Sequence, residues 1–156
     1  MAISIINSQG VQMYVVSPSL GETAPTVALI QAGDLVGCPQ SIGSIEQTRT
    51  VTEYKCLSSN DSVKSLGSIG RGNLEIGLLF DPDDTAGQDA LKTAFASNAE
   101  VTIGIELSDN GGTNGTIFAF NAYVSSVSVG IEQDSAVTYT VTVEIASDVT
   151  ELAAAA

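Results

Sequence analysis

Three aspartates within four residues, Asp81, Asp83 and Asp84, form the group whose side chains and spacing come nearest to a cation site. An EF-hand calcium loop that begins at Asp81 needs glycine at its sixth position and glutamate at its twelfth. This sequence has Ala86 and Lys92 there. The proline between the aspartates suits the first position of a helix, whose positive end attracts carboxylates. We therefore predict that the three aspartates cap a helix N-terminus and bind no metal.

The glycines of residues 67–72 have a spacing that could suggest a phosphate-binding loop. Such loops need a helix directly after the glycines, because the N-terminus of that helix holds the phosphate. A strand-like alternation of apolar residues follows here instead. We therefore predict a flexible loop that binds no cofactor.

The residue types needed for catalysis are largely missing. The chain has no histidine, which excludes Ser-His-Asp and Cys-His catalysis and histidine-ligated zinc or haem. Eighteen acidic residues permit a paired-carboxylate glycosidase, but the chain has no Trp and only four Tyr and four Phe to hold a sugar. Cys38 and Cys56 make no disulfide framework, and we expect reduced, partly buried thiols. We predict that the protein is not an enzyme.

The net charge of the chain is strongly negative, at −13. The five bases do not cluster along the sequence, so the chain lacks a basic patch of the kind that holds nucleic acid, and we expect it to repel DNA. No signal peptide pattern and no apolar run of about 18 residues is present, so we expect folding in a cytoplasm and no membrane binding. The five bases are Arg49, Lys55, Lys64, Arg71 and Lys92.

Alternating or short apolar runs predict seven strands, because side chains alternate between the two faces of a strand. The clearest is the last, where Val and Ile alternate with Thr. The polar faces of four of these strands carry Glu53, Glu75, Glu106 and Glu144. The predicted strands are residues 11–16, 26–30, 45–57, 73–80, 101–107, 116–129 and 137–145.

One helix is expected to interrupt the strands after Asp81. Leu91, Ala94 and Phe95 form an apolar stripe, and Asn98 suits the left-handed position that closes a helix. The remaining segments are expected to be an N-terminal arm at residues 1–10, a long loop at 58–72, a turn at 110–115 and a flexible tail at 151–156. The pattern predicts a single mainly β domain over residues 1–150, a β-sandwich or small barrel with one flanking α-helix.

Two stretches of the sequence resemble siphophage tail tube proteins, the major tail proteins of long, non-contractile, lambda-like tails. Residues 72–84 followed by 87–95 are similar to the family's central strand, its Asp-Pro-Asp turn and a short helix that ends in Phe. Residues 123–130 with 134–143 resemble its C-terminal strand pair, and the strand at 48–53 also fits. The resemblance extends over roughly residues 45–147.

This resemblance implies a tail-tube fold and a structural role in the virion tail. Family members form hexameric rings that stack into a hollow tube, in which the inner sheets of six subunits join into one barrel. The implied partners are the tape measure protein, the tail tip initiator, the tail terminator and, in passing, viral DNA. The implied inter-ring contact is the segment 58–72. An acidic lumen would repel DNA, and its candidate lining residues are Glu53, Glu75, Glu106 and Glu144.

Two alternatives remain open at the level of sequence. One is the tube of a contractile tail or a secretion system, built on the same fold. The other, from a different class, is a monomeric β-sandwich module that binds a ligand.

The strand around Phe118 is apolar on both faces. That pattern fits either contact between subunits or packing between sheet and helix inside one subunit.

Overall fold

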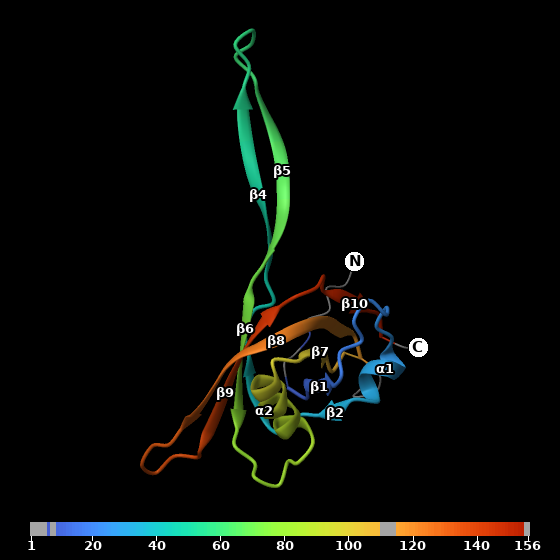
Figure 1. Ribbon diagram of the computed structural model, residues 1–156, viewed down its shortest axis with the longest axis vertical. Helices are drawn as coiled ribbons and strands as arrows, with labels where there is room; N and C mark the ends of the chain where they lie inside the picture. Colours follow the sequence, from blue (N-terminus) through green and yellow to red (C-terminus); the bar gives the residue numbers. More distant parts are fainter. Residues whose placement is uncertain (1–5, 7–8, 110–114, 155–156) are drawn as a thin grey trace.

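The computed structural model describes residues 6, 9–109 and 115–154, and these form ten strands and two helices (Figure 1). The mainly β fold predicted from the sequence is confirmed. The strands are β1 (Gln12–Val16), β2 (Asp34–Leu35), β3 (Pro39–Ile42), β4 (Gln47–Lys55), β5 (Ser62–Arg71), β6 (Asn73–Leu79), β7 (Glu100–Glu106), β8 (Ile117–Gly130), β9 (Thr138–Ile145) and β10 (Thr150–Leu152). The helices are α1 (Val27–Gln31) and α2 (Gly87–Ser97).

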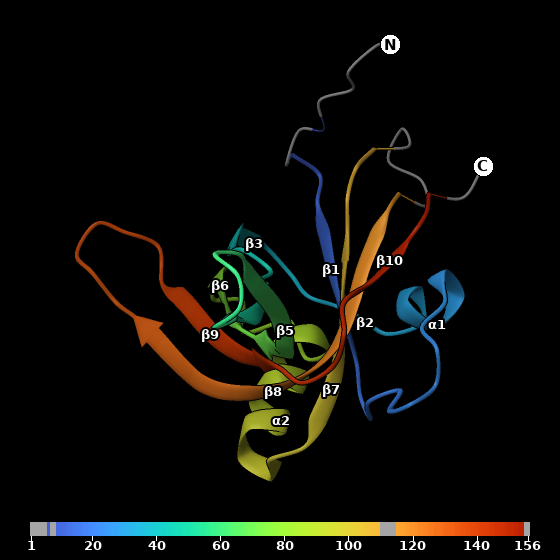
Figure 2. The same cartoon turned by 90° about the horizontal axis from the view of Figure 1, so that it is seen from above.

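The eight strands other than β4 and β5 form one antiparallel sheet that folds over itself into two layers. The order is β2-β1-β7-β8-β9-β6-β3, with β10 paired to the first part of β8. The long strand β8 belongs to both layers. Its first half pairs with β7 and its second half with β9, and Figure 2 shows it curving from one layer to the other. This curvature brings the apolar faces of the two halves together.

The main core lies between these two layers and is closed by α2. Leu74, Ile76 and Leu78 of β6 are fully buried, as their spacing predicted. Alternate residues of β9, from Tyr139 to Ile145, face the same core, together with residues of β1, β7 and β8. Burial of this apolar area stabilises the domain by about 25 cal/mol per Å².

The segment 26–30 is a helix, and the prediction of a strand there was wrong. Thr26 caps it, since its hydroxyl accepts a hydrogen bond from the Leu29 backbone N–H at 3.3 Å. Ile30 on this helix packs with Ile117 and Ala119 on the side of the sheet away from the main core. Short apolar runs do not distinguish a strand from one turn of helix. The two-faced apolar pattern of β8 therefore has a cause inside the subunit.

Helix α2 begins five residues later than the aspartate pattern predicted, since Pro82 was expected at its first position. It runs from Gly87, with Ala86 in the N-cap position, and buries Leu91 and Ala94 against the core. Its C-terminus is as expected, because Asn98 adopts a left-handed conformation with φ 56°. The aspartate segment before it is an extended turn rather than helix.

Strands β4 and β5 pair with each other and form a hairpin, residues 47–71, that projects from the body (Figure 1). The prediction of a loop at 58–72 was wrong, since β5 covers most of it. β5 is rich in Ser and Gly and has little intrinsic strand preference, so its conformation comes from pairing with β4. Only residues 56–61 at the tip connect the two strands.

Several smaller predictions concern the ends and turns. Glu151 and Leu152 pair with β8 in β10, so the start of the predicted flexible tail is ordered sheet. Most of the N-terminal arm, and residues 110–114 of the predicted turn, lie outside the described residues. Cys38 and Cys56 are free thiols, but both are exposed rather than partly buried. In the described part of the chain, neither helix is long and apolar enough to cross a membrane.

Candidate functional site

The sheet formed by β6, β9 and the second half of β8 has a polar face on the side opposite the core. Its residues alternate with the buried ones, and most are threonine, serine or glycine. We call this surface the polar face. By the strand register it comprises Asn73, Glu75, Gly77, Leu79, Tyr123, Ser126, Ser128, Gly130, Thr138, Thr140, Thr142 and Glu144.

Two of the predicted lumen acids meet on the polar face. Glu75 of β6 lies opposite Thr142 of β9, and Glu144 of β9 lies opposite Asn73 of β6. The two glutamates are therefore diagonal neighbours, with Cα atoms about 7 Å apart. Both are exposed. No residue of the polar face is basic. The surface therefore carries only negative charge, surrounded by neutral and mostly small side chains.

A third carboxylate adjoins this face through Tyr123. The register places Tyr123 between Glu144 on β9 and Glu100 on β7. The negative charge of Glu100, followed by a hydrogen bond to it and by burial, raises the pKa of the Tyr123 phenol above its usual value. The phenol stays protonated at neutral pH, so it adds no charge of its own.

The other two predicted lumen acids lie elsewhere. Glu106 is only 6 % exposed, and its carboxylate accepts hydrogen bonds at 3.1 Å from Gln31 Nε2 and from the Gly115 backbone N–H. Helix α1, which sequence reasoning missed, covers that side of β7, so Glu106 does not fit a lumen-lining role. Glu53 is exposed on the hairpin, opposite Lys64 and away from the polar face.

Asp84 organises the start of α2, although it stands two residues before the N-cap. Its Oδ1 accepts from the backbone N–H groups of Ala86 and Gly87 at 3.2 and 2.9 Å. Its Oδ2 accepts from Gln88 and from Gly37 at 3.2 and 2.9 Å. Desolvation raises the pKa of this carboxyl, but the four hydrogen bonds outweigh it and the pKa is lowered overall.

Asp81 and Asp83 do not cap the helix, contrary to the prediction. Asp81 accepts a hydrogen bond from the Asp83 backbone N–H at 3.0 Å, which shapes the turn rather than the helix end. Asp83 is exposed. Among the described residues, no group of three His, Cys, Asp or Glu side chains is placed to hold a metal ion. The capping role therefore belongs to Asp84 alone.

Replacement of Asp84 by asparagine is expected to lower the free energy of unfolding by about 1–2 kcal/mol at pH 7. The amide NH₂ of asparagine would face backbone N–H groups that need an acceptor. Urea denaturation followed by circular dichroism, at a concentration where the protein is monomeric, measures the loss. Asp83→Asn is the matched control, and we expect it to change stability little.

The same pair of variants has a predictable pH dependence. The pKa of Asp84 is lower in the folded protein than its ordinary value of 3.8. The contribution of the ionised carboxylate to folding stability is therefore fully present above pH 3.8, and it is lost as the pH falls through the folded-state pKa. The difference between wild type and Asp84→Asn should therefore shrink below about pH 4. A difference that stayed constant down to pH 2 would contradict the capping role.

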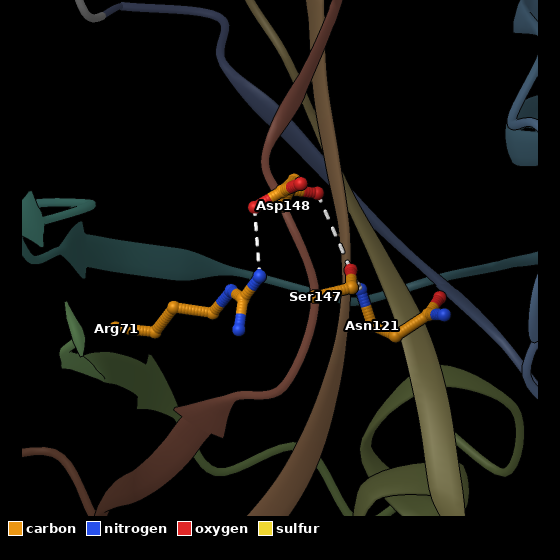
Figure 3. A network of polar contacts seen from close by, with 4 residues as sticks. All are labelled: Arg71, Asn121, Ser147 and Asp148. Carbon is orange, nitrogen blue, oxygen red and sulfur yellow. Dashed lines mark hydrogen bonds and ion pairs between the residues drawn. The ribbon is translucent and has the colours of Figure 1, made fainter. Parts of the chain in front are cut away.

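The hairpin is joined to the body at its base by a small polar network (Figure 3). Arg71 Nη2, at the end of β5, pairs with Asp148 Oδ1 at 2.8 Å. Next to Asp148, the Ser147 hydroxyl accepts from the Asn121 backbone N–H at 2.8 Å. This network connects the hairpin to the segment between β9 and β10. As an exposed ion pair, it contributes at most about 1 kcal/mol to stability.

The distribution of the bases differs from the sequence-based prediction. Arg49 and Lys55 lie on β4, and Lys64 and Arg71 lie on β5, so four of the five bases share the hairpin. Lys92 lies on α2, with its ammonium 5.0 Å from the Phe80 ring centre. The bases are separated in sequence but are brought together by the pairing of β4 with β5, which had been predicted as strand and loop.

Solved structures share this fold across most of their length. The SPP1 tail tube is 17 % identical, with 95 % of this chain and 78 % of that chain covered and a TM-score of 0.64. A chain of the PVC sheath–tube complex of an extracellular contractile injection system is 16 % identical, with 96 % and 92 % covered and a TM-score of 0.67. A chain from the tail of a gene transfer agent particle is 13 % identical, with 94 % and 98 % covered and a TM-score of 0.65. At these identities the similarity shows the fold alone.

The sequence comparisons identify the family. No curated protein sequence matches the chain. A family model described as phage tail tube, lambda-like, matches residues 4–154, which is nearly the whole chain. Together with the sandwich, the projecting hairpin and the polar face, this match shows that the chain belongs to the lambda-like phage tail tube protein family.

Proposed function

We propose that six copies of this chain form a ring and that stacked rings make the hollow tube of a virion tail. The tube encloses the tape measure protein during assembly and later passes viral DNA. The tip initiator and the tail terminator contact its two ends, and assembly takes place in the host cytoplasm. The protein has no catalytic role, needs no cofactor and does not bind membranes.

The observation that carries this proposal is the polar face. It is a sheet surface of neutral, mostly small side chains with Glu75 and Glu144 and no base. If this face lines the lumen, each ring presents twelve carboxylates to the passing duplex. Repulsion between carboxylate and phosphate is effective within a Debye length of about 10 Å. DNA therefore passes without sticking to the wall.

Negative-stain microscopy of the purified protein at high concentration tests the assembly. We expect rings or tubes with a central hole and sixfold symmetry. Tubes surrounded by a sheath in the complete particle would indicate a contractile tail instead. Sedimentation that showed a monomer at every concentration, with no rings even when the tail tip initiator is present, would contradict the proposal and favour a ligand-binding module.

Charge reversal of the polar face tests the lumen assignment. We expect particles with Glu75→Lys and Glu144→Lys to assemble but to eject DNA at least about tenfold more slowly at low salt, because twelve ammonium groups per ring would bind phosphate. Ejection measured by fluorescence of released DNA should recover as salt is raised. Glu22→Lys with Asp34→Lys is the matched control, since both carboxylates are exposed outside this face. Ejection at the wild-type rate would show that the polar face is not the lumen wall.

A further inference from the structure

The apolar core is closed at one end of the sandwich and open at the other. Helix α2 covers one end, and Figure 2 shows the start of β1 at the opposite end. A groove of about 890 Å³ lies there, between β3 with the segment that follows it and the ends of β1, β7, β8 and β10. Its volume is in the range of about 300–1,000 Å³ that holds a drug-sized ligand or a few residues of chain. We call it the open groove.

The walls of the open groove are apolar and incompletely covered. Six large apolar side chains line it and are only partly buried, although four of them belong to the edge of the main core. Within the described lining, Glu151 is the one ionisable side chain, and it is exposed. Because monomeric proteins rarely leave a contiguous apolar surface in water, we expect another apolar segment to cover it. The six side chains are those of Val11, Ile42, Ile45, Leu107, Phe118 and Val149.

The chain enters β1 from the wall of this groove. Gln9, Gly10 and Val11 are among its lining residues, and Gln9 and Gly10 form a turn. Gly10 has a φ of 85°, a conformation that favours glycine. The Ser108 hydroxyl, beyond the end of β7, donates a hydrogen bond to the Gln9 carbonyl at 2.6 Å. The turn and this hydrogen bond together fix the start of β1 at the groove.

The segment before this turn has the composition to fill the groove. Residues 2–6 are Ala-Ile-Ser-Ile-Ile and carry no charged side chain. Residues 2–8 together span at most about 25 Å when fully extended. Since the wall of the groove includes Gln9, this length is enough for Ile3, Ile5 and Ile6 to enter it. An apolar segment is thus tethered directly beside an apolar groove.

We propose that residues 2–6 occupy the open groove of their own subunit and close the core at that end. The tether at Gln9 favours this occupant over a second copy of the chain. A short linker gives an effective concentration in the millimolar range, and closing so short a loop costs little entropy. A segment of another molecule therefore enters the groove only by displacing residues 2–6. The free subunit covers its own apolar surface in this way, whether or not it later joins a ring.

Disulfide trapping in the monomeric protein tests this docking. Ile3→Cys, Ile5→Cys and Ile6→Cys are each combined with Val149→Cys, in a chain whose own thiols are removed by Cys38→Ser and Cys56→Ser. Disulfides form only where the two Cβ atoms can approach to about 4 Å. We expect oxidation with copper phenanthroline to give an intramolecular disulfide in at least one variant, seen as a faster-migrating monomer on a non-reducing gel.

The control replaces Val149→Cys by Glu132→Cys. Glu132 is exposed in the connection between β8 and β9, which projects away from the start of β1 in Figure 2. This pairing should give no intramolecular disulfide. A disulfide-linked dimer in place of the cross-linked monomer would show that a second copy fills the groove. That result, or the absence of any cross-link to Val149→Cys from all three positions, would overturn the proposal.

Removal of the three isoleucines gives a second readout. We expect the variant with Ile3→Ser, Ile5→Ser and Ile6→Ser to bind at least about threefold more anilinonaphthalene sulfonate, a dye that fluoresces on exposed apolar surface. Circular dichroism checks that the variant is folded. Dye binding equal to that of the wild type would show that these residues do not cover the groove.

The matched control removes three apolar side chains that are exposed on the hairpin. These substitutions are Leu57→Ser, Val63→Ser and Leu66→Ser, and they should not raise the dye fluorescence. Both experiments use the monomer, so their outcome is independent of ring formation. A failure of this inference therefore differs from a failure of the proposed function.

Discussion

Replacement of Phe120 by alanine is expected to lower the free energy of unfolding by about 3–5 kcal/mol. Phe120 lies on β8 opposite Ile103 of β7, is 2 % exposed, and is one of the largest buried side chains of the described core. It sits on the strand that joins the two layers of the sandwich, so the cavity would open at their junction. Urea denaturation followed by far-ultraviolet circular dichroism measures the loss, since the chain has no tryptophan.

Phe95→Ala is the matched control for this substitution. Phe95 lies on α2 but is 42 % exposed, so truncation removes little buried area from the subunit. We expect a loss well below that of Phe120→Ala in the monomeric protein. If the two variants were equally destabilised, the described core would not be the main source of stability.

Gly87→Ala is expected to cost about 1–3 kcal/mol of stability, because it overpacks the contact between α2 and β2. A methyl group at this position would overlap the Leu35 carbonyl oxygen and the Val36 Cα, which are backbone atoms and cannot rotate away. The first turn of α2 would have to move off the body. The expected result is a lower urea midpoint, although alanine is the better helix former.

Gly72→Ala serves as the control, since its added methyl group would lie 3.4 Å from the Glu46 Cβ, an ordinary contact. We expect a change of less than about 1 kcal/mol there. A gain in stability for Gly87→Ala, as helix propensity alone predicts, would show that α2 does not pack closely on the Leu35–Val36 backbone.

The strands that face the core could be predicted from the sequence because their alternation is strict. Leu74, Ile76 and Leu78 are all buried, and the Val and Thr alternation of β9 gives the buried set that includes Val141 and Val143. A period of two is readable without a structure wherever one face is apolar and the other polar. The family resemblance seen in two of these regions is confirmed by the family match.

The missed elements take their conformation from pairing or packing with other segments, which their own residue pattern does not show. β5 forms through its register with β4, which its Ser and Gly content does not reveal. The alternation of β7 indicated an exposed Glu106, but Ile30 and Gln31 of α1 cover that side of the strand. Only the cap residue Thr26 could have suggested that helix.

The prediction of a loop in place of β5 also concealed how the bases are distributed in space. Arg49 and Ile69 are twenty residues apart in sequence and directly opposite in space. Without that pairing, the bases look scattered along the chain and the acidity looks uniform. The pairing of β4 with β5 instead gathers four of the five bases on one hairpin.

The projecting hairpin also bears on how fast tubes begin and grow. Each residue that becomes fixed costs about 1–2 kcal/mol of backbone entropy, and a hairpin held mainly by its own two strands has little to offset that cost before it docks. Two free subunits that meet must order both partners at once, whereas a subunit that joins a finished ring meets surfaces already in place. Polymerisation should therefore show a lag that preformed ring ends abolish. The number of tails would then follow the number of seeds, and the concentration of subunits would set only how fast each one lengthens.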